Sequence, residues 1–198
     1  MFAFDPIGLP GIAAFLLGAL GFVVAVLAAR SGRARDAGEA DAKRSRASLT
    51  GVILQGFGIG VAGFGRQRVE LDPLGAEALA EAAAVTLLMA GCVALFVWAA
   101  RTMGRNWSIV ARTRAGHALV EAGPFAFVRH PIYVAMALFM VGLAIAFGHT
   151  RQLLLAGPLF ALGTWWRVRI EEALLRQQFG AEYDGYAARV KRFVPGLF

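Results

Sequence analysis

Two short stretches of the sequence concentrate side chains that could do chemistry. The first, residues 123–133, sets Arg129, His130 and Tyr133 between two apolar segments. The second, residues 167–172, holds two arginines and two glutamates directly after another apolar segment. Ionisable side chains at the mouth of a membrane span are expensive, and they are functional candidates by default. We therefore expect the two stretches to meet and to form one site.

The residue types in these stretches suit the binding of a charged small molecule. Arg129 carries a permanent positive charge and a planar donor fork that matches a carboxylate or a phosphate. Arg167 and Glu171 are four residues apart and share one face of a helix, where they bind a ligand or neutralise each other. Glu172 and Arg176 share a neighbouring face, and we predict an ordinary solvated ion pair for them.

Other kinds of catalytic site find little support in the sequence. There is no serine in a strand–turn–helix elbow, and the three histidines are scattered rather than paired at metal-ligand spacing. Cys92 is the single cysteine, which excludes an internal disulfide and a cysteine-based metal cluster. We expect no metal site.

The composition is that of a membrane protein. The 198 residues are 58% hydrophobic and 17% charged, and the mean hydropathy is +0.61, whereas soluble domains carry about 25% charged residues. The net charge of +7 is explained by cytoplasmic loops rather than by nucleic-acid binding. Because no small-residue cleavage pattern follows it, the first apolar segment is expected to be retained.

Five apolar segments predict five membrane-spanning helices. We place them at residues 9–29, 49–64, 82–100, 131–147 and 153–166. The last two form an antiparallel hairpin over residues 131–166, which returns the second polar stretch to the membrane face of the first. The fold class is therefore all-α integral membrane. The chain is expected to be a single membrane domain, with N-terminal spans in residues 1–100 and the chemically active region in residues 101–198.

Two segments predict packing rather than chemistry. Gly56 and Gly60 lie in a glycine-rich run that resembles a nucleotide loop, but no strand–helix–strand context surrounds it. Their spacing instead favours close helix packing of the small-xxx-small type. Residues 179–198 predict an amphipathic helix at the membrane interface, which Pro195 and Gly196 end, with Tyr183, Tyr186 and Val190 on one side.

The distribution of basic residues predicts the orientation in the membrane. Seventeen of the 20 Lys and Arg residues lie in residues 30–46, in residues 101–129 and from Arg167 onward. Positive charge accumulates on the cytoplasmic side. We therefore expect the N-terminus outside, the C-terminus in the cytoplasm and both polar stretches facing the cytoplasm, in the inner membrane of a bacterium.

The C-terminal half resembles the isoprenylcysteine carboxyl methyltransferase family and its phospholipid methyltransferase relatives. The resemblance covers about residues 101–195. It is carried by the motifs Gly123-Pro124-Phe125, Val128-Arg129-His130-Pro131-Ile132-Tyr133, Glu171-Glu172 and Phe179-Gly180-Ala181-Glu182-Tyr183-Asp184-Gly185-Tyr186, followed by Arg189-Val190.

The resemblance implies S-adenosyl-L-methionine as methyl donor, bound in a cytoplasmic pocket of the C-terminal half. The residues that match the family's cofactor positions are His117, Ala118, Leu119, Val120, Phe125, His130, Pro131, Ile132, Tyr133 and Glu171. Phe125 stands where relatives often have tyrosine and so lacks a hydroxyl. Glu171 suits a cationic part of the donor, and aromatic rings suit the sulfonium. Arg129 and Arg167 are the expected catalytic residues, which steer the polar head of the acceptor.

The implied function is an integral-membrane methyltransferase with a lipid-like or small amphiphilic acceptor that enters from the bilayer. A sterol-type membrane reductase that uses NADPH is the alternative enzyme, and a non-enzymatic accessory membrane subunit is the third interpretation. O-, N- and S-methylation all stay open, because the substrate cannot be deduced from the sequence.

Overall fold

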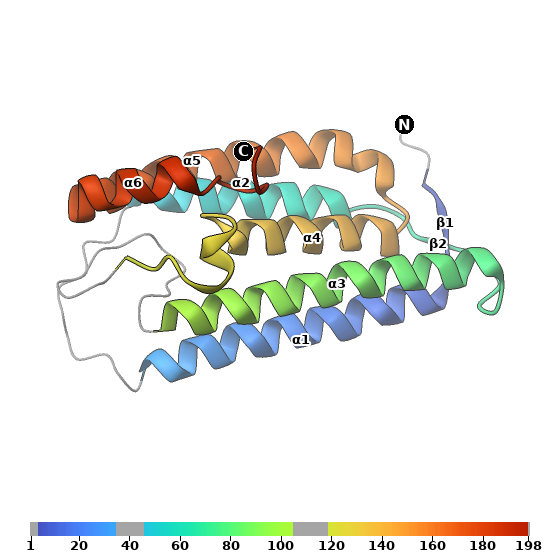
Figure 1. Ribbon diagram of the computed structural model, residues 1–198. Coiled ribbons are helices and arrows are strands. Elements are labelled where there is room, and N and C mark those ends of the chain that lie inside the picture. Colours follow the sequence, from blue (N-terminus) through green and yellow to red (C-terminus); the bar gives the residue numbers. More distant parts are fainter. Residues whose placement is uncertain (1–3, 35–45, 105–118, 198) are drawn as a thin grey trace.

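The computed structural model describes residues 4–34, 46–104 and 119–197, and most of this part of the chain is helical (Figure 1). In this part of the chain, five long helices run alternately in opposite directions, and a short helix follows them. They are α1 (Leu9–Ala34), α2 (Arg46–Gly63), α3 (Ala76–Met103), α4 (Pro131–Ala146), α5 (Leu153–Phe179) and α6 (Ala181–Arg189). The predicted all-α class is confirmed as far as the helical content is concerned. A two-residue parallel pair, β1 (Pro6–Ile7) with β2 (Arg68–Val69), was not predicted.

The helices pack as two pairs with α4 between them. α1 lies along α3, α2 lies along α5, and α4 contacts mainly α3 (Figure 1). Apolar clusters fill these contacts, and their centres are Phe15 with Met89, Cys92 with Phe96, and Ala156 with Phe160. The predicted hairpin therefore exists, but its second helix packs on α2 rather than on α4.

Two of these helices are long and apolar enough to cross a membrane. They cover Leu9–Ser31 and Ala76–Met103, and shorter apolar helices cover Leu49–Gly63 and Pro131–Ala146. In the most apolar 18-residue stretch of the first of these helices, only 6% is buried inside the protein. A helix that is apolar all round and hardly covered by protein suits contact with lipid. All five predicted segments are helical, and α5 continues past Trp166 to Phe179.

The prediction that Gly56 and Gly60 mediate helix packing is wrong. A Cβ at either position would meet nothing within 4 Å. Gly58 makes the close contact instead, since a Cβ there would lie 2.8 Å from the backbone nitrogen of Phe160. Gly163 of α5 faces α2 in the same way, since a Cβ at this position would lie 2.8 Å from the backbone nitrogen of Gln55. Apart from Gln55, residues 51–63 of α2 are apolar, so composition did not show which of its glycines turn inward.

The predicted C-terminal helix is also shorter than expected. It begins after Gly180, whose φ of +54° favours glycine, and it ends at Arg189. Beyond it, Lys191 runs parallel to Val128. The backbone N–H groups of Arg129 and His130 donate to the carbonyls of residues 191 and 192, at 2.8 and 3.0 Å. An extended segment satisfies these two donors, which a continuing helix could not do.

Candidate active site

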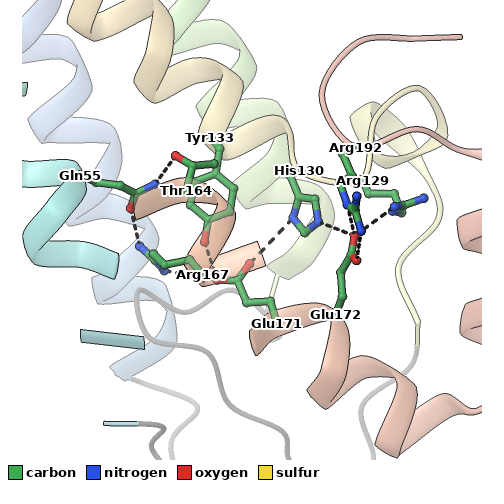
Figure 2. A network of polar contacts seen from close by, with 9 residues as sticks. All are labelled: Gln55, Arg129, His130, Tyr133, Thr164, Arg167, Glu171, Glu172 and Arg192. Carbon is green, nitrogen blue, oxygen red and sulfur yellow. Dashed lines mark hydrogen bonds and ion pairs between the residues drawn. The ribbon is translucent and has the colours of Figure 1, made fainter. Parts of the chain in front are cut away.

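The two polar stretches meet, as predicted, because Arg129 and His130 lie against Glu171 and Glu172 (Figure 2). His130 stands immediately before α4, with Pro131 in the first helical turn, where its missing N–H costs nothing. The preceding chain forms a short 3-10 helix, η2 (Gly123–Ala126). Gly123 has a φ of +60°, and a Cβ there would lie 2.5 Å from the hydroxyl of Thr102. Glycine is therefore required for this turn to pack on α3.

One part of the site is a cluster of charges held by the C-terminal segment, residues 190–193, which we call the strap. Arg129 donates to the carbonyls of Ala187 (2.7 Å) and Val190 (2.5 Å) and to Glu172 (3.0 Å). Arg192 donates from Nε and Nη2 to the two oxygens of Glu172, at 2.9 and 2.7 Å. We call Arg129, Glu172 and Arg192 the strap side of the site.

The prediction that Glu172 forms a solvated pair with Arg176 is wrong. Glu172 is 2% exposed. Burial alone would raise the pKa of its carboxyl, but hydrogen bonds from His130, Arg192 and Arg129 together hold that pKa well below its usual value. Arg176 turns instead to Asp184 of α6, at 3.0 Å. Glu172 therefore pairs with Arg129 and Arg192, which are distant in sequence, and not with Arg176, four residues away on the same helix.

The other part of the site is built between α2, α4 and α5. Tyr133 donates to Glu171 Oε1 at 2.5 Å, and Arg167 donates from Nη2 to the same oxygen at 3.3 Å. Arg167 also donates from Nη1 to Gln55 Oε1 (3.2 Å), and its guanidinium carbon lies 5.2 Å from the centre of the Tyr133 ring. Gln55 Nε2 donates to the hydroxyl of Thr164 at 2.8 Å. We call these five residues the bundle side of the site. The pairing of Arg167 with Glu171 was predicted.

His130 joins the two sides. Its Nε2 lies 3.3 Å from Glu172 Oε1, and its Nδ1 lies 3.8 Å from Glu171 Oε2 (Figure 2). A neutral imidazole can donate to only one of these carboxylates, whereas the protonated ring can donate to both. The ring therefore couples two adjacent glutamates that otherwise have different partners.

Exposure shows where a ligand can reach this network. The side chain of Glu171 is 23% exposed, whereas those of His130, Arg167 and Glu172 are nearly covered. Oε2 of Glu171 lies 3.8 Å from His130 Nδ1, which is beyond hydrogen-bond length, so it can accept from a cationic ligand group. Arg192 is 45% exposed and lies on the other side of His130, where it can pair with an anionic group (Figure 2). The donor set therefore fits an amino-acid moiety, with its ammonium and its carboxylate.

The remaining predicted cofactor residues are placed as follows. Leu119 and Val120 are half-buried in irregular chain before η2, and Phe125 is buried in η2, where its carbonyl accepts from Tyr186 at 2.7 Å. Ile132 turns toward the apolar cluster around Cys92. His117 and Ala118 lie outside the described residues.

Sequence reasoning missed three members of the site. Gln55 is the one amide in the apolar part of α2, and a single polar residue in such a segment is a signal that could have been used. Thr164 carries no comparable signal. Arg192 was counted only among the charges of the C-terminal segment.

Comparison with known proteins identifies relatives of the C-terminal half. A sequence-family model described as phospholipid methyltransferase matches residues 80–182, more than half of the chain. The chain is 37% identical over 100 residues to the nickel-cobalt-cadmium resistance protein NccN of Alcaligenes xylosoxydans xylosoxydans. The aligned residues are 48% of this chain and 45% of the relative. It is 34% identical over 104 residues to the protein-S-isoprenylcysteine O-methyltransferase B of Arabidopsis thaliana, covering 48% of this chain and 49% of the relative. It is 32% identical over 98 residues to the protein-S-isoprenylcysteine O-methyltransferase of Schizosaccharomyces pombe, covering 46% and 40%. The matched stretch thus spans about half the length of these relatives or less.

Proposed function

This chain belongs to the phospholipid methyltransferase family, and from that premise we propose that it is a membrane methyltransferase that uses S-adenosylmethionine to methylate the carboxylate of an amphiphilic acceptor. The observation that carries the proposal is Glu171, a partly exposed carboxylate whose Oε1 accepts hydrogen bonds from Tyr133 and Arg167 and whose Oε2 lies near His130. A carboxylate fixed in this way is pre-organised for a cationic ligand group.

On the donor side, we assign the ammonium group to Glu171 and the donor's carboxylate to Arg192. Tyr133 and Arg167 keep Glu171 in place through its Oε1, and His130 lies 3.8 Å from its second oxygen. When bound, S-adenosylmethionine supplies a methyl group on a positively charged sulfur. The residues of the chain need only orient the acceptor toward that methyl group and exclude water.

On the acceptor side, the charges of the site favour an anion. Its described members include three arginines, Arg129, Arg167 and Arg192, against the two carboxylates Glu171 and Glu172. A carboxylate acceptor is already a nucleophile at neutral pH, whereas an amine must first lose a proton to a base. Two of the relatives named above are O-methyltransferases of isoprenylcysteine, which agrees with this choice. We assign the steering of the acceptor head to Arg167, with Arg129 as a more distant charge.

We propose five spans, with the site at the cytoplasmic surface of the membrane. Three tryptophans, Trp98, Trp165 and Trp166, have 42–48% of their surface exposed, and the guanidinium carbon of Arg169 lies 4.8 Å from the ring centre of Trp165. Tryptophan beside arginine is typical of a membrane boundary. Cysteine labelling from outside should then reach a probe at residue 150 but not one at residue 187. The reverse pattern would contradict the orientation.

The proposal is tested with the purified protein in detergent or vesicles. Methyl-labelled S-adenosylmethionine is supplied with a total membrane lipid extract, and the labelled product is identified and treated with alkali, which cleaves a methyl ester but not a methylated amine. We expect an alkali-labile, lipid-soluble product with the wild-type protein and a strongly reduced yield with Glu171→Gln. Stabilisation by NADPH but not by S-adenosylhomocysteine would favour the reductase alternative instead.

The name of the relative NccN refers to nickel, cobalt and cadmium resistance. In the described ranges, no group of three or more His, Cys, Asp and Glu side chains is arranged to hold a metal ion.

A further inference from the structure

We propose that Gln55 of α2 is a positioning residue for the acceptor: it holds the Arg167 guanidinium in the orientation in which that cation receives the acceptor's anionic head. The inference rests on the proposed function and deepens it, because it assigns part of the acceptor selection to α2. That helix lies outside residues 80–182, the stretch matched by the family model.

The first argument is the burial of an amide in an apolar helix. Gln55 is 1% exposed, and burying an amide is unfavourable unless its hydrogen bonds are satisfied. Both ends of the amide are used: Oε1 accepts from Arg167 Nη1 at 3.2 Å, and Nε2 donates to Thr164 at 2.8 Å. The orientation of the amide is also determined, since arginine is a donor only and must face the amide oxygen.

The second argument is the close contact between α2 and the stem of Arg167. A Cβ at Gly51 would lie 2.3 Å from Arg167 Cγ, and a Cβ at Gly163 would lie 2.8 Å from the backbone nitrogen of Gln55. Glycines at both positions let the arginine stem lie directly against α2. The side chain of Arg167 is thus confined along its stem by α2 and at its head by Gln55, Glu171 and the ring of Tyr133.

The third argument concerns how the two terminal nitrogens of the guanidinium are divided. Nη1 is held by Gln55 and Nη2 by Glu171, the carboxylate that we assign to the donor. If Gln55 is removed, the guanidinium loses its anchor on α2 and can turn to pair with Glu171 through both nitrogens, which is the preferred geometry of arginine with a carboxylate. Arg167 would then interact more strongly with Glu171 and less strongly with the anionic head of the acceptor.

The experiment compares two buried glutamines that undergo the same substitution. Gln55→Leu removes the anchor of Arg167. Gln152→Leu is the matched control, because Gln152 is also buried but donates to the carbonyl of Phe64 at the opposite end of the bundle. Gln55→Glu keeps an oxygen for Arg167 and adds a negative charge.

The first measurement needs no enzyme activity. NMR of protein labelled with 15N in arginine reports how fast the guanidinium group rotates, and the Arg167 signal is assigned by its loss in Arg167→Lys. We expect slow rotation in the wild type, in Gln152→Leu and in Gln55→Glu, and rotation faster by tenfold or more in Gln55→Leu. Unchanged rotation in Gln55→Leu, or an equal change in Gln152→Leu, would overturn the proposal.

The second measurement separates acceptor from donor. The acceptor probe is S-farnesyl-N-acetylcysteine, which combines a carboxylate with an isoprenoid tail as the names of the relatives suggest, and S-adenosylhomocysteine is the donor-site probe. We expect Gln55→Leu to raise the acceptor KM about tenfold, the size of one hydrogen bond to a charged group, with kcat and the Kd of S-adenosylhomocysteine changed by less than about threefold. Gln55→Glu should also raise that KM, because its charge competes with the acceptor.

The outcomes distinguish the inference from the proposed function. An unchanged acceptor KM in Gln55→Leu overturns the inference while methylation by the wild type still supports the function. A wild-type protein that methylates neither the probe nor any membrane lipid contradicts the proposed function, and the guanidinium rotation then decides by itself whether Gln55 holds Arg167.

Discussion

The strap side and the bundle side of the site use similar residue types in different ways. On the strap side, Glu172 is 2% exposed, and its two oxygens are occupied by Arg129, Arg192 and His130. On the bundle side, Glu171 is 23% exposed, and its Oε2 lies 3.8 Å from His130 Nδ1, too far for a hydrogen bond. Two glutamates adjacent in sequence therefore serve different purposes, and exposure rather than residue type distinguishes them.

This difference indicates that the Glu172 carboxylate is satisfied within the protein, whereas the Glu171 carboxylate is available to a ligand. A buried carboxylate with several cationic partners fixes the fold, since removing one partner leaves uncompensated charge. The strap side thereby ties the C-terminal segment to the start of α4. A partly open carboxylate with one weakly engaged oxygen is suited to binding. We therefore expect substitutions of Arg129 and Glu172 to lower mainly stability and those on the bundle side to lower ligand affinity. Arg192, which is 45% exposed and to which we assign the donor's carboxylate, should affect both.

The largest effect is expected for Glu172→Gln. The change leaves Arg129, Arg192 and His130 around a neutral amide, and breaking a buried ion pair in this way costs about 3–5 kcal/mol of stability. Chemical denaturation in detergent measures the free energy of unfolding. Asp184→Asn is the control, because Asp184 forms an exposed pair and should change stability by about 1 kcal/mol or less. Equal small losses in both variants would mean that the strap is not held by Glu172.

Acidification should act on the same carboxylate. The pKa of Glu172 in the folded protein is lowered, chiefly by hydrogen bonds from His130 and Arg192 that outweigh its burial, whereas the unfolded chain has the ordinary value of 4.5. Below that pH the unfolded state binds a proton that the folded state does not, so the stabilisation present above pH 4.5 is lost as the pH falls. Denaturation between pH 6 and pH 3 should show a steeper decline for the wild type than for Glu172→Gln. Parallel declines would contradict this account.

A smaller and different effect is expected for Glu171→Gln. The variant keeps the shape of the side chain but removes its charge, and a lost charge-assisted hydrogen bond should weaken binding of S-adenosylhomocysteine by about 1.5–3 kcal/mol, or ten- to a hundredfold. Calorimetric titration measures the affinity. Glu121→Gln, which alters an exposed pair with Arg189, should bind like the wild type. Full affinity in Glu171→Gln would remove Glu171 from the donor site.

Much of the site's assembly could be predicted from the sequence. The apolar segments gave an even number of crossings between the two polar stretches, so that His130 and Glu171 had to return to the same end of the bundle. The i, i+4 spacing gave the pairing of Arg167 with Glu171, because both partners lie on one helix. Those predictions depend only on helix length and periodicity, which are local properties.

The rest could not be predicted because it depends on contacts between distant segments. Helical spacing offered Arg176 as the partner of Glu172 and gave no means of seeing Arg192, which reaches it from the strap. Likewise the part of α2 that carries the glycines is apolar except for Gln55, so its pattern did not show that Gly58 rather than Gly56 faces α5, and the one available signal, Gln55, was not used. A helix without a polar face leaves its rotation to be decided by the partner helix.

The smallest effect is expected between Glu172 and Arg176, and it tests whether Glu172 is buried against the strap. Arg176 lies four residues after Glu172 on α5, yet it donates to Asp184 at 3.0 Å and its guanidinium carbon lies 5.4 Å from the centre of the Tyr183 ring. In a double-mutant cycle of Glu172→Gln with Arg176→Gln, we therefore expect a coupling energy below about 0.5 kcal/mol, because independent sites are additive within that range. The cycle of Arg176→Gln with Asp184→Asn should give about 0.2–1 kcal/mol, the value of an exposed pair. A coupling above about 1 kcal/mol between residues 172 and 176, far beyond what additive sites show, would place Glu172 at the surface of α5. It could not then hold the strap, and the distinction between a closed side and an open side would fail.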